Sequence, residues 1–237
     1  KTEEFLQMYE DLQPRTLFPA LRSLVYVQRA PPTTSGGRER YLTVHYAPLL
    51  GNERVAGLDV ATQPANLVAL ERARDTDEPS MSAVFDMVQL GQDGRPLKGF
   101  ILRLPLYSPG PRPLDVDERR RRFIGSPAAS FTVNDLLARA LPEEVGQIQV
   151  RVVDITDGRE VLLFGAGEEW STAAAEGALA ERREIDFAGR RWRLDLLPLP
   201  QFSESLRVIP LISFGFGAVA SLLLAALFFN VARTRET

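Results

Sequence analysis

The spacing of apolar residues in the first 30 positions predicts a helix. Apolar side chains recur there every three or four positions, and this period is typical of a helix with one buried face. The positions are Phe5, Met8, Tyr9, Leu12, Leu17, Phe18, Leu21, Leu24 and Val25. We therefore predict a helix over residues 1–30, interrupted at Pro14. Two interpretations stay open: the helix packs on its own domain, or it is a stalk that pairs with a second copy of the chain.

Residues 31–110 carry the signals of one small α/β module. They comprise a Pro/Thr/Gly-rich loop, an alternating strand, a helix that opens at a proline, and two strands joined by a hairpin loop. In that order the segments are 31–37, 41–46, a helix from Pro64 that ends within 75–79, 82–90 and 98–107 with the loop 91–96. The helix has its apolar face at Leu67, Leu70 and Ala73.

Residues 111–207 follow a proline-rich linker and carry the signals of a second module with a similar order of elements. Four consecutive arginines, 119–122, follow two acidic residues, and we expect them on a solvated helix face that answers nearby acids. A strand, a short helix and two hairpins are then predicted, over 123–131, 134–141, 147–164 and 184–196. The predicted fold class is α+β: a long N-terminal stalk helix, two tandem modules and a membrane helix at the C-terminal end.

The segment 208–232 is uncharged and apolar. As a helix it would extend about 37 Å, enough for a hydrocarbon core of about 30 Å. We predict a transmembrane helix there; the alternative is a buried helix of a globular core. Two arginines follow the segment and one precedes it, which favours a cytoplasmic C-terminus, 233–237, and places residues 1–207 outside the cytoplasm. A small-residue stripe, Ser213, Gly217, Ser221 and Ala225, is either a helix-packing seam or a chance pattern in a span rich in small residues.

The composition excludes several classes of protein and of functional site. The 237 residues are 25% charged and 45% hydrophobic, which is ordinary for a folded protein and excludes a mainly disordered chain. A net charge of −3 argues against a nucleic-acid-coating protein. The absence of cysteine and the single histidine leave no candidate set for a metal site, a cofactor or a nucleophile–base pair. We therefore expect no enzyme within this chain.

Several short motifs, taken in order, resemble the CHASE sensor domain. They are Gly57-Leu58-Asp59, Arg72-Ala73-Arg74, Ser80 to Phe85, Leu102 to Tyr107, Phe123-Ile124-Gly125, Leu136-Leu137 and Val152 to Ile155. The resemblance covers about 20–200. It implies an extracytoplasmic input domain of a histidine kinase of a two-component system, or of a nucleotide cyclase. It also implies a stalk helix (1–30) and two PAS-like modules, one distal to the membrane (31–110) and one proximal (111–207).

The resemblance also implies a ligand site in the distal module. The positions that correspond to ligand contacts of cytokinin receptors are Asp59, Met81 through its backbone, and Arg103. Arg103 departs from the family, because those receptors carry a small hydroxyl residue there. A guanidinium favours a carboxylate ligand, and Asp59 opposite it would suit an amino-acid-like zwitterion. The alternative is that Asp59 and Arg103 pair with each other and bind nothing.

These observations give a leading function and an alternative. The leading function is ligand sensing outside the cytoplasm, with binding in the distal module and transmission through the membrane helix to a cytoplasmic output domain beyond this chain. The alternative is a ligand-free periplasmic dimerisation or protein-interaction ectodomain. The expected partners are a small molecule, the membrane and a second copy of the chain, without nucleic acid. Because the chain begins at Lys1 and ends at Thr237, shortly after the predicted span, we expect a fragment of a longer protein.

Overall fold

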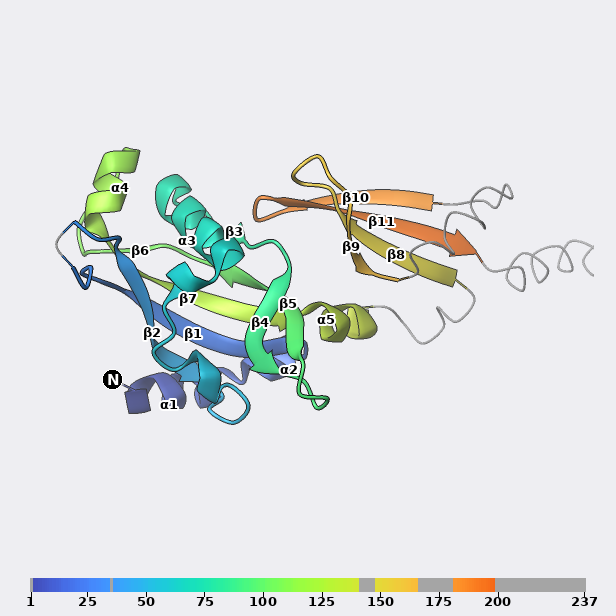
Figure 1. Cartoon of the computed structure of the whole chain (residues 1–237), viewed down its shortest axis with the longest axis horizontal. Helices are drawn as coiled ribbons and strands as arrows, with labels where there is room; N and C mark the ends of the chain where they lie inside the picture. The colour runs from blue at the N-terminus through green and yellow to red at the C-terminus, as the bar shows by residue number, and fades with distance from the viewer. Residues whose placement is uncertain (1, 35, 141–147, 166–180, 199–237) are drawn as a thin grey trace, which may run out of the picture. The chain divides into compact units, whose positions relative to one another are not determined.

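The computed structural model of the chain describes residues 2–34, 36–140, 148–165 and 181–198 (Figure 1). One compact unit consists of residues 1–142, 151–165 and 182–195. The other consists of 143–150, 166–181 and 196–237, and most of it lies outside the described residues.

The first sheet has seven strands within the described residues, in the order β2-β1-β7-β5-β3, with β4 paired to β5 and β6 paired to β7. The pairs β1–β2, β1–β7, β3–β5, β4–β5, β5–β7 and β6–β7 are antiparallel. The strands are β1 (Leu21–Ala30), β2 (Arg40–Ala47), β3 (Ser80–Met81), β4 (Phe85–Leu90), β5 (Pro96–Arg103), β6 (Leu106–Tyr107) and β7 (Phe123–Thr132).

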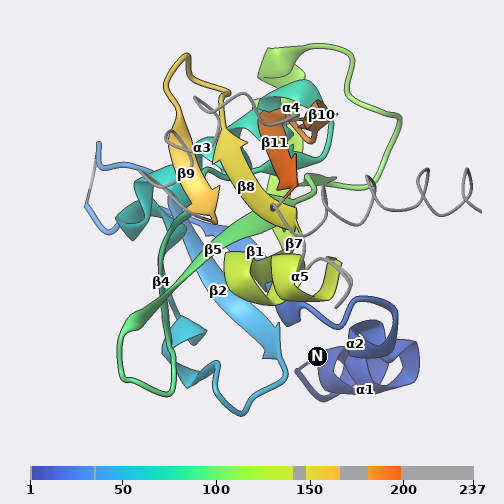
Figure 2. The ribbon, with the colours of Figure 1, turned by 90° about the vertical axis from the view of Figure 1, so that its right-hand side faces the viewer.

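Helices lie on both sides of this sheet. Figure 1 shows α1 (Thr2–Leu12) and α3 (Pro64–Thr76) on opposite sides of it. Pro64 occupies the first turn of α3, where its missing N–H costs nothing. The buried side of α3 includes Leu67 and Leu70, which join the apolar core with Val25 and Val27 of β1. The remaining helical elements are α2 (Pro14–Leu17), η1 (Glu53–Val55), η2 (Val60–Thr62), α4 (Val116–Arg122) and α5 (Val133–Ala140), which follows β7 and contacts β5 and β7 (Figure 2).

The prediction of one helix over residues 1–30 is wrong in its second half. Helical structure ends at Leu17, and β1 begins at Leu21. Residues four apart, such as Leu21 and Val25, share a face in a helix and also in a strand, so their spacing alone does not separate the two. The alternating burial along β1 and its pairing with both β2 and β7 decide for the strand.

The predicted boundary after residue 110 is also misplaced. The strand predicted over 123–131 exists as β7, but it lies between β1 and β5 in the first sheet. It therefore belongs to the first sheet, with the strands of residues 31–110, rather than opening a second module. The strand pairs with β1, which lies about 100 residues earlier in the sequence, and a local sequence pattern does not predict a pairing over that distance.

The second sheet has the order β10-β11-β8-β9 among the described residues. Its strands are β8 (Ile148–Asp154), β9 (Val161–Phe164), β10 (Glu181–Phe187) and β11 (Arg190–Pro198), and the two hairpins predicted for this region are confirmed. Both central residues of the β10–β11 turn, Ala188 and Gly189, have positive φ (46° and 80°), which suits a tight hairpin.

The predicted transmembrane segment 208–232 lies outside the described residues, as does the small-residue stripe of Ser213, Gly217, Ser221 and Ala225. In the part of the chain that is described, no helix is long and apolar enough to cross a membrane.

Candidate functional site

A small cavity lies between the first sheet and the segment that carries η2 and α3, in the module that this sheet forms. Its volume is about 20 Å³, which is enough for roughly one water molecule. The lining mixes apolar side chains with an unusual number of polar ones. The polar lining includes Ser23, Thr43, Gln63, Asn66, Gln89 and Arg103. All six are buried, so polar groups lie in the interior of this module beside its apolar core.

Arg103 is the charged residue of this lining. It is the last residue of β5, and its side chain points to the same side of the sheet as Ile101 of the core. Only 1% of Arg103 is exposed. Its Nε donates to Asn66 Oδ1 (2.7 Å) and its Nη1 to Ser126 Oγ (3.3 Å). Both acceptors are neutral, and burial lowers the pKa of Arg103 from its ordinary value to about 9.

No carboxylate pairs with Arg103 among the described residues. A buried charge without a counter-charge is expensive, so proteins usually place an acid beside it. The polar lining here instead supplies amide and hydroxyl groups. The guanidinium thus remains a buried cation with donor capacity beyond its two neutral acceptors.

Two amide side chains fix the orientation of Arg103. Asn66, near the start of α3, donates from Nδ2 to Gln63 Oε1 (2.8 Å). Its Oδ1 is therefore the atom that faces Arg103 Nε. Gln63 is the N-cap residue of α3, so the start of this helix and the end of β5 are connected through one chain of hydrogen bonds. This arrangement fixes the position of the guanidinium.

Asp59 does not join Arg103. Its Oδ2 accepts from Arg40 Nε at 3.0 Å, and its Oδ1 accepts from the backbone N–H groups of Tyr41 and Ala61. Asp59 is the N-cap of η2 and ties this segment to β2. Partial burial by itself would raise the pKa of Asp59, but these donors lower it below its ordinary value. The alternative in which Asp59 pairs with Arg103 is therefore wrong, and Asp59 is absent from the cavity lining.

Met81, the third predicted contact, is also absent from the lining. Its backbone N–H donates to the carbonyl of Ala188, in the β10–β11 turn, at 2.8 Å. The group that the resemblance assigned to a ligand thus serves a contact within the protein. Of the three predicted residues, only Arg103 reaches the cavity.

Sequence reasoning missed the neutral partners of Arg103. The signal for one of them was present: Asn66 stands on the same side of its helix as Leu70 and Ala73, so a polar residue interrupts an apolar stripe. Ser126 offered no such signal, because β7 was assigned to another module.

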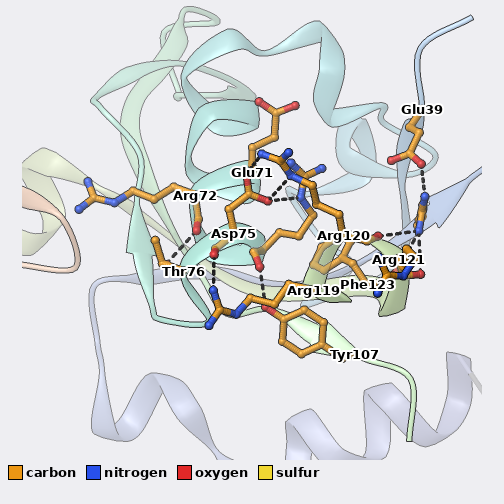
Figure 3. Close-up of polar contacts among 12 residues, drawn as sticks. Glu39, Glu71, Arg72, Asp75, Thr76, Tyr107, Arg119, Arg120, Arg121 and Phe123 are labelled. Carbon is orange, nitrogen blue, oxygen red and sulfur yellow. Dashed lines mark hydrogen bonds and ion pairs between the residues drawn. The ribbon is translucent and has the colours of Figure 1, made fainter. Parts of the chain in front are cut away.

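The arginine run forms a second polar cluster, on the surface of the distal module (Figure 3). Arg120 of α4 forms two hydrogen bonds with Asp75 of α3, at 3.1 and 2.6 Å, and Arg119 donates to the carbonyl of Asp75 at 2.8 Å. Burial would raise the pKa of Asp75, yet the bonds from Arg120 and Arg74 lower it to about 2. The expectation that these arginines pair with nearby acids is confirmed for Arg120, with Asp75, and for Arg122, with Glu118. The bonds from Arg119 and Arg120 to Asp75 hold α4 against α3.

Comparisons with known proteins place the chain in a family. Residues 1–164 match the family model of the CHASE domain. No curated protein matches. Among solved structures, the chain is similar to an extracellular ligand binding receptor from Desulfohalobium retbaense, with 20% identity and a TM-score of 0.47. That match covers 77% of this chain but 31% of the receptor, so the chain spans about a third of its length.

A second similar structure is the periplasmic sensory domain of the Campylobacter jejuni chemoreceptor Tlp1. It is 10% identical with a TM-score of 0.44, and the match covers 81% of this chain and 79% of that one. The family assignment rests on the CHASE match, which spans more than half of the chain. CHASE domains are extracytoplasmic sensor domains and are not catalytic. This chain belongs to the CHASE family and is an extracytoplasmic sensor domain.

Proposed function

We propose that the chain senses a small molecule that binds in the cavity of the distal module. The observation that carries the proposal is Arg103, a buried cation that is hydrogen-bonded to neutral groups and lines a cavity. A polar interior of this kind costs stability, and binding sites are where proteins retain such a cost. A ligand with a negative group would supply the missing counter-charge.

Binding requires the cavity to enlarge, because its present volume suits a water molecule. The β4 side offers the weakest wall: its pairing with β5 is irregular between Asp86 and Leu90, while Met87 and Gln89 of this stretch line the cavity. A ligand that prefers the enlarged state shifts the equilibrium between two conformations by its differential affinity.

The change passes from the distal module through the second sheet to residues 208–232, which form the transmembrane helix in this proposal. Residues 1–207 then lie outside the cytoplasm and 233–237 inside, ahead of a kinase or cyclase output domain. The small residues Ser213, Gly217, Ser221 and Ala225 form the packing seam of a homodimer. The two sheets act as tandem PAS-like modules.

A screen of thermal stability tests ligand sensing. The purified chain is melted with a panel of organic acids, amino acids and adenine-type compounds. A ligand at 100 times its Kd stabilises the folded state by about 2.7 kcal/mol, a readable shift. Stabilisation that Arg103→Gln abolishes supports the proposal. Silence across the panel contradicts it and favours the alternative below.

The absence of cysteine permits a direct test of topology. Single cysteines introduced as Ser203→Cys and Thr234→Cys are labelled in intact cells with a membrane-impermeant maleimide. Labelling of the first and protection of the second support the proposed orientation. The reverse pattern, or labelling of both, contradicts it.

A ligand-free interaction ectodomain is the second candidate. The observation in its favour is the exposed apolar surface near the N-terminus, where Leu12, Leu17 and Phe18 are all more than half exposed. Such side chains suit contact with a second copy or another protein. Dimerisation of the purified chain, together with the absence of stabilisation by any compound of the ligand screen, would favour this function.

A further inference from the structure

The charges around the cavity define the class of ligand. Arg103 supplies a positive charge, and the lining contains neither aspartate nor glutamate. Its other polar groups are hydroxyls and amides from the strands and from the start of α3. The cavity therefore offers a counter-charge for an anionic group and offers none for a cationic group.

Asp59 is the acid that was expected to supply a negative charge to the cavity, but its carboxylate binds other groups outside the cavity. Both of its carboxylate oxygens accept hydrogen bonds, from Arg40, from the Tyr41 N–H and from the Ala61 N–H. Moving it to the cavity would break the cap of η2 and the pair with Arg40. An ammonium group in the cavity would thus lie near a guanidinium without an acid to neutralise it, and like charges in a poorly solvated site repel strongly.

The geometry of Arg103 also selects the anion. Nε is taken by Asn66, while Nη1 makes a longer bond to Ser126. The Nη1–Nη2 end of the guanidinium is the part with spare donors. Two parallel N–H groups at that end match the two oxygens of a carboxylate, which accepts them as a bidentate pair. The neutral hydroxyl and amide groups of the lining can bond hydroxyl or carbonyl groups on the rest of the molecule.

From this arrangement we infer that the distal cavity selects a small carboxylate without an ammonium group, such as a hydroxy acid or keto acid, over the corresponding amino acid. The inference rests on the proposed sensing function and specifies its ligand class. It replaces the zwitterion expectation, which depended on Asp59 lying opposite Arg103.

Three acids with the same carbon skeleton test it: lactate, pyruvate and alanine. They share the carboxylate and differ at the second carbon, which bears a hydroxyl, a keto group or an ammonium. The purified chain is melted with each compound at equal excess, against sodium chloride at matched ionic strength. We expect lactate or pyruvate to raise the Tm and alanine to leave it unchanged.

Two variants locate the effect. Arg103→Lys keeps the charge but loses the planar pair of donors, so the apparent Kd for the stabilising acid should weaken by about tenfold or more. Asp59→Asn, which changes a side chain outside the cavity, should retain the preference for lactate or pyruvate over alanine. A loss of that preference in Asp59→Asn alone would overturn the inference.

The remaining outcomes separate the inference from the proposed function. Stabilisation by alanine equal to or greater than that by lactate and pyruvate would overturn the inference and leave sensing intact. So would silence of all three together with a response to another compound of the wider panel. Silence of all compounds would overturn both.

Discussion

Replacing Arg103 with methionine should stabilise the protein in the absence of ligand. Methionine fills a similar volume without charge. The charge of Arg103 is disfavoured by burial, which lowers its pKa from the ordinary value of an arginine to about 9. That difference corresponds to on the order of 5 kcal/mol of unfavourable free energy at neutral pH. Against it stands the loss of the bond to Asn66 Oδ1, which leaves a buried acceptor unpaired at a cost of about 1–3 kcal/mol.

The balance is a gain of about 2–4 kcal/mol, the range seen when buried ions are replaced by apolar residues. For a chain of this size the lower end corresponds to a rise in Tm of roughly 4–8 °C. Urea unfolding of the purified chain, followed by circular dichroism in a buffer without carboxylates, measures it. Arg120→Met is the matched control, because Arg120 is paired with Asp75 at the surface; its removal should be neutral or mildly destabilising.

The gain should also depend on pH. Above pH 9 the folded chain releases the proton of Arg103, whereas the unfolded chain, in which the guanidinium is hydrated, holds it to a higher pH. The unfolded state binds more protons in this window, so the stability contributed by the native residue rises with pH. The advantage of Arg103→Met should therefore be about 1 kcal/mol smaller at pH 10 than at pH 7. A variant less stable than the native chain at pH 7 would refute the reasoning, because Arg103 would then be a compensated structural residue.

Three further variants test the surrounding structure. Asp75→Asn should destabilise by about 1–2 kcal/mol at pH 7; because the native pKa is lowered from 3.8 to about 2, urea unfolding should show the deficit shrinking as the pH falls from about 4 to 2. Gly125→Ala should cost about 1–3 kcal/mol in thermal unfolding, since a Cβ would lie 2.4 Å from the carbonyl oxygen of Val27. Asp59→Ala should cost about 1–2 kcal/mol by loss of a cap and, in chemical unfolding at pH 7, leave the gain from Arg103→Met unchanged.

Elements with strong local signals were predictable from the sequence. The helix that opens at Pro64 and the hairpin at Ala188-Gly189 each combine a turn or cap residue with a clear period, and both formed as predicted. The failures are non-local. The apolar spacing of β1 fits a helix as well as a strand, and only its pairing with β2 and β7 identifies it as a strand. The same pairing with β1 places β7 in the first sheet.

The candidate site was predictable only in its charge. Arg103 stood out because an arginine occupies a position where the family resemblance expects a small residue. Its partners did not stand out. Ser126 belongs to a strand that the sequence pattern assigned to another module. Asp59 was expected near Arg103 from the family resemblance, but it caps η2. Side-chain partners across a sheet depend on register, which single-sequence patterns do not specify.

The amide of Asn66 offers the sharpest test of the missing counter-charge. Asn66→Asp changes little in shape, yet it places a carboxylate where Oδ1 already accepts from Arg103 Nε at 2.7 Å. The second carboxylate oxygen replaces the Nδ2 donor to Gln63, so the Gln63 amide must turn and donate its own N–H instead. The new pair should stabilise the ligand-free chain in urea unfolding and remove the stabilisation by lactate or pyruvate, because the guanidinium is then neutralised from within. The double variant with Arg103→Met buries the new carboxylate alone and should be less stable than either single variant, so a double-mutant cycle measures the pair. If the same acid stabilises Asn66→Asp as strongly as the native chain, the ligand does not contact Arg103 and the cavity is not the binding site.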